Sequence, residues 1–178
     1  MAWHKANPWR ADTAVFEAET KKLMKGWGIK ATGYKSVIDA GAGPRLRSTY
    51  FKRSKLYAIE PLAEAFKREL SWCDLDKASA VYAVPLEQYI PDLRAEFLIC
   101  INVLDHCQDF DKAVANLSRY ADTLFLSYDC GEPDPMHPLH LNEVVSEMSF
   151  MQYGLKVDKF EIGDPYRAGY SMNYWLSK

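Results

Sequence analysis

Apolar and polar residues follow two periods along the chain, and these predict a regular order of strands and helices. Short, mainly apolar runs bounded by polar residues or glycine are typical of buried strands, and an apolar stripe at every third or fourth position is typical of a helix. The strand pattern occurs at 35–40, 55–60, 79–84, 95–104, 123–128, 155–161 and 170–177. The helical pattern occurs at 12–27, 62–70, 111–121 and 141–152, with Asp12 as an N-cap for the first of these helices.

The order of these segments predicts the fold class. Strand and helix alternate until the end of the chain, where two strands are separated only by GDPYRAG. Only a turn and a short helix fit between the first two strands, so we expect those strands to be parallel neighbours. The pattern predicts an α/β protein with a Rossmann-like, doubly wound, mostly parallel sheet of seven strands, completed by an antiparallel C-terminal hairpin strand.

Length and composition limit the organisation and the partners. A chain of 178 residues suits one domain, so we expect 1–178 to form a single domain in which 1–11 is an N-terminal arm. The formal net charge of −2 argues against nucleic acid as a partner. No apolar run approaches the roughly 18 residues of a membrane span. The four cysteines lack zinc spacing and no secretion signal is present, which predicts a reduced, cytoplasmic protein.

The stretch SVIDAGAGPRL (36–46) carries the first chemical signal. Ligands of open parallel sheets bind beyond the carboxyl ends of the strands, where Gly41 and Gly43 allow a close backbone approach. Such a turn can hold either a nucleotide's phosphates or the amino-acid end of S-adenosylmethionine. A dinucleotide fingerprint requires a third glycine, but Leu46 stands there. Glu60, at the end of the second strand, could accept hydrogen bonds from a ribose in either ligand.

Three motifs in order resemble those of the class I S-adenosylmethionine-dependent methyltransferases. DAGAG (39–43) is similar to the first motif of that family, Glu60 to its ribose-binding acid, and NVLDHCQD (102–109) to the loop after its fourth strand. The order of elements agrees over about 12–178, including the closing hairpin. The resemblance implies that fold and S-adenosylmethionine as cofactor.

The resemblance also implies roles for individual residues. The glycine turn would hold the methionine part, Glu60 would bind the ribose, and Asn102 would face the methionine end. Asp39 would either orient the glycine turn or reach the ammonium group of the cofactor through water. The implied cofactor-binding residues are Asp39, Gly41, Ala42, Gly43, Glu60, Pro61, Leu62, Leu86, Glu87 and Asn102. Arg45 departs from the third glycine that is frequent in the first motif of this methyltransferase family. Its side chain would either bring a positive charge toward the carboxylate of the cofactor or point to solvent, and we expect the latter.

Methyl transfer needs a base only when the acceptor loses a proton. His106, in the loop after the central strand, is the candidate for this catalytic role, because imidazole titrates near neutral pH. A helix cap near Asp109, or packing under the cofactor, is the alternative for His106. Adjacent side chains diverge, which argues against a nucleophilic pair of His106 with Cys107.

His137 and His140 form an H-x-x-H pair in a Pro-containing loop. The pair lacks the helical i, i+4 spacing of zinc helices, so we expect no metal site. A contact with the acceptor and a purely structural loop role are the readings that stay open for both residues.

We therefore expect an enzyme that transfers a methyl group from S-adenosylmethionine to an unidentified small-molecule acceptor. A cofactor-binding module that acts as a partner or sensor is the alternative, and an NAD-dependent oxidoreductase is a weaker one. No cap domain is inserted, so the acceptor pocket would be built from the arm and short loops, or from the second subunit of a homodimer. Aromatic residues at both termini, including Trp3, Trp9 and Tyr166, suit an acceptor pocket or plain packing.

Overall fold

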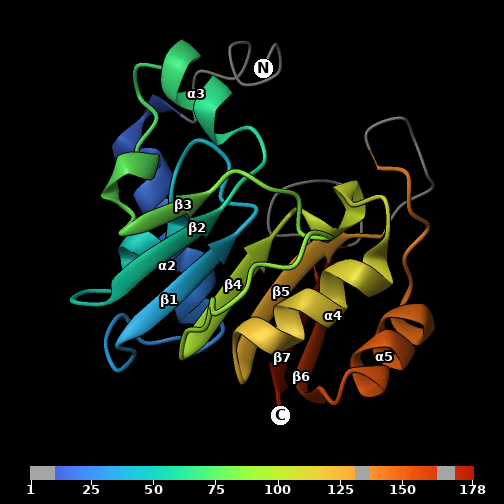
Figure 1. Cartoon of the computed structure of the whole chain (residues 1–178). Helices are drawn as coiled ribbons and strands as arrows, with labels where there is room; N and C mark the ends of the chain where they lie inside the picture. The colour runs from blue at the N-terminus through green and yellow to red at the C-terminus, as the bar shows by residue number, and fades with distance from the viewer. Residues whose placement is uncertain (1–10, 131–136, 164–170) are drawn as a thin grey trace.

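A computed structural model describes residues 11–130, 137–163 and 171–178. These residues form a seven-stranded sheet with the strand order β3-β2-β1-β4-β5-β7-β6 (Figure 1). The strands are β1 (Ser36–Ala40), β2 (Lys55–Ile59), β3 (Ala80–Tyr82), β4 (Phe97–Ile101), β5 (Thr123–Asp129), β6 (Lys156–Gly163) and β7 (Ser171–Ser177). The α-helices are α2 (Thr13–Gly26), α3 (Ala63–Glu69), α4 (Phe110–Tyr120) and α5 (Glu143–Gln152). Short 3-10 helices are η2 (Arg47–Tyr50), η3 (Leu75–Lys77) and η4 (Leu104–His106).

The strand directions confirm the predicted fold class. β1 pairs in parallel with β2 and with β4, and the parallel part of the sheet continues to β3 on one side and β5 on the other. β7 is antiparallel to both β5 and β6. The winding reverses beside β1, so the carboxyl ends of β1 and β4 meet at the position where open sheets bind ligands.

Helices cover both faces of the sheet because its strands are apolar on both faces. Alternate residues of β1 show this: Ile38 belongs to the core beneath α4 and α5, whereas Val37 belongs to the core beneath α2. In Figure 1, α4 and α5 lie on one side of the sheet and α2 lies on the other. The central strands are therefore rigidly held, and the loops at their carboxyl ends start from fixed positions.

The strands are shorter than the sequence pattern predicts at two places. The apolar run 95–104 contributes only Phe97–Ile101 to the sheet, because Asn102 has a positive φ of 59° and turns the chain away. The run 79–84 contributes only Ala80–Tyr82. The predicted cap of the first helix is confirmed, since the Asp12 carboxylate accepts hydrogen bonds from Ala14 N and Val15 N.

Some predictions concern residues outside the described ranges. The N-terminal arm falls there apart from Ala11, as does most of the GDPYRAG segment with Tyr166. Within the described ranges, every helix is too short or too polar to cross a bilayer.

Candidate functional site

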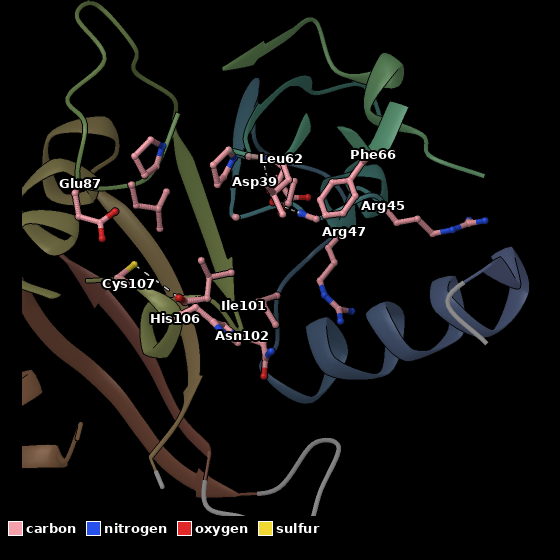
Figure 2. A pocket seen from close by; sticks show the side chains of 18 of the residues that line it. Asp39, Arg45, Arg47, Leu62, Phe66, Glu87, Ile101, Asn102, His106 and Cys107 are labelled. Carbon is pink, nitrogen blue, oxygen red and sulfur yellow. Dashed lines mark hydrogen bonds between the residues drawn. The ribbon is translucent and has the colours of Figure 1, made fainter. Parts of the chain in front are cut away.

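A cavity of about 530 Å³ opens at the carboxyl ends of β1, β2 and β4. This volume lies within the range of small-molecule and cofactor sites. Figure 2 shows Glu87, Cys107 and His106 on one side of the cavity, and Phe66, Arg45 and Arg47 on the other. The cavity is lined by all eleven residues that were predicted to bind the cofactor or to act in catalysis, namely Asp39, Gly41, Ala42, Gly43, Glu60, Pro61, Leu62, Leu86, Glu87, Asn102 and His106. The structure thus brings the candidates together, while their roles stay predictions.

The two glycines of the turn after β1 are required for different reasons. Both have positive φ, 67° at Gly41 and 63° at Gly43, which an L side chain adopts only with strain. A Cβ atom at Gly41 would also lie 2.3 Å from Cγ2 of Val103, so the β1 and β4 loops can touch only through glycine. A Cβ atom at Gly43 would meet no atom within 4 Å. Gly41 therefore packs two loops together, whereas Gly43 keeps space open beside the turn.

The buried carboxylate of Glu60 links two of the loops around the cavity. Its Oε2 accepts a 2.8 Å hydrogen bond from Gly43 N, and its Oε1 accepts a 2.9 Å bond from Leu62 N. Burial raises the pKa of Glu60, while these two backbone donors lower it. Each carboxylate oxygen has a further lone pair, so the group can still accept a hydrogen bond from a ligand.

Asp39 stands at the end of β1 and holds the segment that follows the glycine turn. Its Oδ2 accepts a 2.8 Å hydrogen bond from Ser48 N, at the start of η2. Burial raises the pKa of Asp39 to about 6, although the Ser48 hydrogen bonds and the Arg47 charge oppose that shift. This contact fixes the position of Ser48, in the segment that continues the turn, while the orienting role of Asp39 stays a prediction.

The expectation that Arg45 points to solvent is wrong. The residue is only 6 % exposed, and its guanidinium donates hydrogen bonds to Thr13 Oγ1 at 2.9 Å and to the Ala11 carbonyl at 2.7 Å. The guanidinium also lies 5.5 Å from the ring centre of Trp72. The start of α2 is folded back over the turn, and this places acceptors around Arg45 that lie far away in sequence.

The loop after β3 forms the wall opposite the glycine turn. Leu86 is buried, and its carbonyl accepts a 2.8 Å hydrogen bond from Asn116 Nδ2 of α4. Glu87 Oε1 accepts a 2.7 Å hydrogen bond from Gln108 N, which ties this loop to the loop after β4. Pro61 and Leu62 are exposed, and they offer apolar surface to the same cavity as Leu86.

Local contacts in the loop after β4 bear on two readings from the sequence, the helix cap near Asp109 and the nucleophilic role of Cys107. Asp109, through its own side chain, is the N-cap of α4, accepting a 3.0 Å hydrogen bond from Lys112 N. The Cys107 thiol donates to the Val103 carbonyl, with a sulfur–oxygen distance of 3.7 Å. Burial raises the pKa of Cys107 to about 12, so the sulfur stays a neutral thiol at physiological pH.

Sequence reasoning missed Asp105, which is placed beside two histidines. Its Oδ2 lies 3.8 Å from His106 Nε2 and 3.7 Å from His137 Nε2. His106 and His137 both line the cavity, with ring centres 4.5 Å apart, whereas His140 is exposed. Burial raises the pKa of Asp105, and the two histidines lower it. The only signal for Asp105 in the sequence is an acid just after the central apolar strand.

Comparisons with known proteins give structural matches only. No protein-family model matches the chain, and no curated protein matches it in sequence. The 1,6-didemethyltoxoflavin-N1-methyltransferase of Burkholderia thailandensis, solved with bound 1,6-didemethyltoxoflavin and S-adenosylhomocysteine, is similar with a TM-score of 0.65. The match has 14 % identity and covers 99 % of this chain and 84 % of that one.

Two further structures are similar over most of both chains. The magnesium protoporphyrin IX methyltransferase of Synechocystis PCC 6803, solved with S-adenosylmethionine, has a TM-score of 0.61 and 17 % identity over 94 % of this chain and 80 % of that one. The N-methyltransferase NodS of Bradyrhizobium japonicum WM9 has a TM-score of 0.68 and 12 % identity, covering 94 % and 98 %. At these identities the likeness establishes the fold. The chain therefore has the fold of the class I S-adenosylmethionine-dependent methyltransferases.

Proposed function

We propose that this protein transfers a methyl group from S-adenosylmethionine to a small-molecule acceptor. One observation carries the proposal: the Glu60 carboxylate bonds the amide of Gly43, so an acid and a glycine turn face one cavity where the winding of the sheet reverses. S-adenosylmethionine needs this combination, because it presents a ribose diol next to an amino-acid group.

The lining of the cavity fits the parts of this cofactor. The turn at 41–43 can receive the methionine part because Gly43 leaves open space beside it. The spare lone pairs of Glu60 suit the ribose hydroxyls, and the apolar surface of Pro61, Leu62 and Leu86 suits a flat adenine. Among the described residues, the lining contains no lysine. A pyrophosphate would need cationic donors in the cavity. The guanidinium of Arg45 instead donates to Thr13 and to the Ala11 carbonyl.

The chemistry of the step requires mainly position and exclusion of water. The cofactor supplies an activated methyl on a sulfonium, and methyl transfer is an in-line displacement. The chain's own contribution is the fixed loop after β4, which is held by the contact of Val103 with Gly41 and by the bond from Gln108 N to Glu87. His106 lies on this wall, where we propose that it acts on a proton that the acceptor loses. Two of the structural neighbours are named for small-molecule acceptors, which supports an acceptor of that class.

An activity screen tests this proposal. The protein is incubated with S-adenosylmethionine and a panel of small hydroxy, amino and thiol compounds, and mass spectrometry follows S-adenosylhomocysteine and methylated products. We expect both products to appear together for one acceptor class and to be lost in Glu60→Ala. Arg94→Ala, at an exposed ion pair with Asp122, is the control that keeps activity. Cofactor binding without turnover for any compound would instead support a binding module.

A further inference from the structure

Three side chains with metal-binding atoms converge at the cavity wall formed by the loop after β4. Asp105 and His106 belong to η4, and His137 comes from the segment between β5 and α5. One oxygen of Asp105 and one ring nitrogen of each histidine all lie within 4.8 Å of one another. The two histidines line the cavity, while Asp105 lies behind them.

The Asp105 carboxylate is buried, and no other residue that the structure describes donates a hydrogen bond to it. Its side chain is 1 % exposed, and neither oxygen has a hydrogen-bond partner within the part of the chain that the structure describes. Removing an ionised carboxylate from water without such partners is costly, by several kcal/mol. A cation bound between the Asp105 carboxylate and the two histidines would compensate this cost.

The distances within this group separate a metal site from a hydrogen-bonded pair. Hydrogen bonds from a ring nitrogen to a carboxylate are about 2.7–3.2 Å long, shorter than both Asp105–histidine distances of 3.8 and 3.7 Å. Ligands about 2.0–2.1 Å from a tetrahedral zinc ion lie roughly 3.3–3.4 Å from each other. If the distance from Asp105 Oδ2 to each histidine Nε2 shortened by about 0.4 Å, it would equal the separation between two ligands of a tetrahedral ion. Small rotations allow that, because the side chains of His106 and His137 are 32 % and 26 % exposed.

The two imidazole rings lie close enough together for one ion to reach both. Their centres are 4.5 Å apart. One divalent ion would bind a nitrogen of each ring and also compensate the charge of Asp105. Two nitrogens and one carboxylate oxygen form a ligand set for zinc and its neighbours, whereas Mg²⁺ and Ca²⁺ require oxygen ligands.

We propose that Asp105, His106 and His137 bind one divalent transition-metal ion of the Zn²⁺ type, with an open coordination position toward the cavity. Three protein ligands and one open position are typical of catalytic rather than structural zinc. The proposal differs from the expectation of no metal site, which was based on the spacing of His137 and His140. The fold pairs His137 with Asp105 instead.

The role of this ion rests on the proposed function. An oxygen or nitrogen of the acceptor that coordinates the metal loses its proton to water more readily. Its lone pair then forms the bond to the methyl carbon as the carbon–sulfur bond of the cofactor breaks. In this arrangement His106 acts on the acceptor's proton through the metal and not as a free base.

Calorimetric titration of the chelator-treated protein with ZnCl₂ and with MgCl₂ tests the site. We expect saturable binding of one Zn²⁺ and none of Mg²⁺ in the same concentration range. Removing a second-shell partner already lowers metal affinity about 10–100-fold, so Asp105→Asn and His137→Ala are expected to lower Zn²⁺ affinity about 100-fold or more. His140→Ala changes an exposed histidine three positions from His137, and should leave the affinity unchanged.

A second readout protects the test against variants that merely unfold. Zn²⁺ should raise the unfolding temperature of the unmodified protein and of His140→Ala, but not that of His137→Ala, because only a native-state ligand stabilises. Equal Zn²⁺ affinity in the unmodified protein and in both ligand variants would overturn the proposal, as would no saturable binding at all. These titrations contain no S-adenosylmethionine, so their failure leaves the proposed function standing, and failure to bind S-adenosylmethionine leaves the metal site standing.

Discussion

The amide of Gly43 donates a 2.8 Å hydrogen bond to Oε2 of Glu60, and this bond joins the turn after β1 to the end of β2. The other oxygen of the same carboxylate accepts from Leu62 N. A single buried acid thus holds two loops at the cavity, and it does so with spare acceptor capacity toward the open space beside Gly43. The geometry of the turn therefore depends on one residue, which under the proposed function would also recognise the ribose.

The paired variants Gly41→Ala and Gly43→Ala separate packing from binding. Both place alanine at positive φ, which costs about 1–2 kcal/mol. Gly41→Ala also forces a Cβ atom against Val103. Such overpacking costs about 1–3 kcal/mol more. Denaturant unfolding should therefore show a larger loss of stability for Gly41→Ala.

Gly43→Ala should fold, and it should weaken S-adenosylmethionine binding by about tenfold or more, a change of at least about 1.4 kcal/mol. The reason is that its Cβ atom enters the open space beside the turn. Calorimetry measures this change. Equal stability losses in the two variants, or unchanged affinity in Gly43→Ala, would contradict the roles assigned to the two glycines.

Arg45→Ala should destabilise the protein through the start of α2. The change removes hydrogen bonds to Thr13 and Ala11 and the stacking on Trp72. Hydrogen bonds from charged groups contribute about 1.5–3 kcal/mol each, so we expect a loss of about 2 kcal/mol or more in unfolding free energy. The control is Arg94→Ala, whose ion pair with Asp122 is more than half exposed and should contribute little. Similar losses in both variants would argue against the buried anchor.

Asp39→Asn should change how stability depends on pH. Burial raises the pKa of Asp39 from 3.8 to about 6, so between these values the folded protein binds more protons than the unfolded chain. Stability contributed by this group is then fully present below pH 3.8 and is lost as the pH rises through about 6. Asparagine keeps an oxygen that can accept from Ser48 N but cannot ionise.

We therefore compare the free energy of unfolding of Asp39→Asn with that of the unmodified protein at each pH. This difference should shift in favour of the variant by about 1–3 kcal/mol between pH 4 and pH 7. Urea unfolding at several pH values measures the difference. Comparison with the unmodified protein isolates Asp39, since the pKa values of Glu60 and Asp105 are raised by burial in both proteins. A difference that stays constant with pH would show that Asp39 is not a buried acid of this kind.

The sheet could be predicted from the sequence because its signals are local. Apolar runs mark the strands, and the short link between β6 and β7 indicates an antiparallel pair. The ends of strands were less predictable: the apolar run through Val103 and Leu104 continues past β4, but the left-handed backbone of Asn102 ends the strand.

The side-chain contacts of the site depend on the tertiary fold. Arg45 is buried by α2, whose first residues lie more than thirty positions earlier in the chain. His137 meets Asp105 only because β4 and β5 are neighbours whose carboxyl ends lie together. Neither contact leaves a periodic trace in the sequence, which is why charge and spacing alone led to a solvent-exposed arginine and did not pair His137 with Asp105.

Calorimetric titration of the purified protein with S-adenosylmethionine, S-adenosylhomocysteine and NAD, repeated on Glu60→Ala, tests the central claim most directly. We predict micromolar binding of both sulfur compounds, no binding of NAD, and affinity at least about tenfold weaker in the variant. The reason is that Glu60 holds the turn and, in the proposed function, accepts a hydrogen bond from the ribose. Absence of heat with all three compounds, or a preference for NAD, would contradict the assignment of this cavity to a methyl donor.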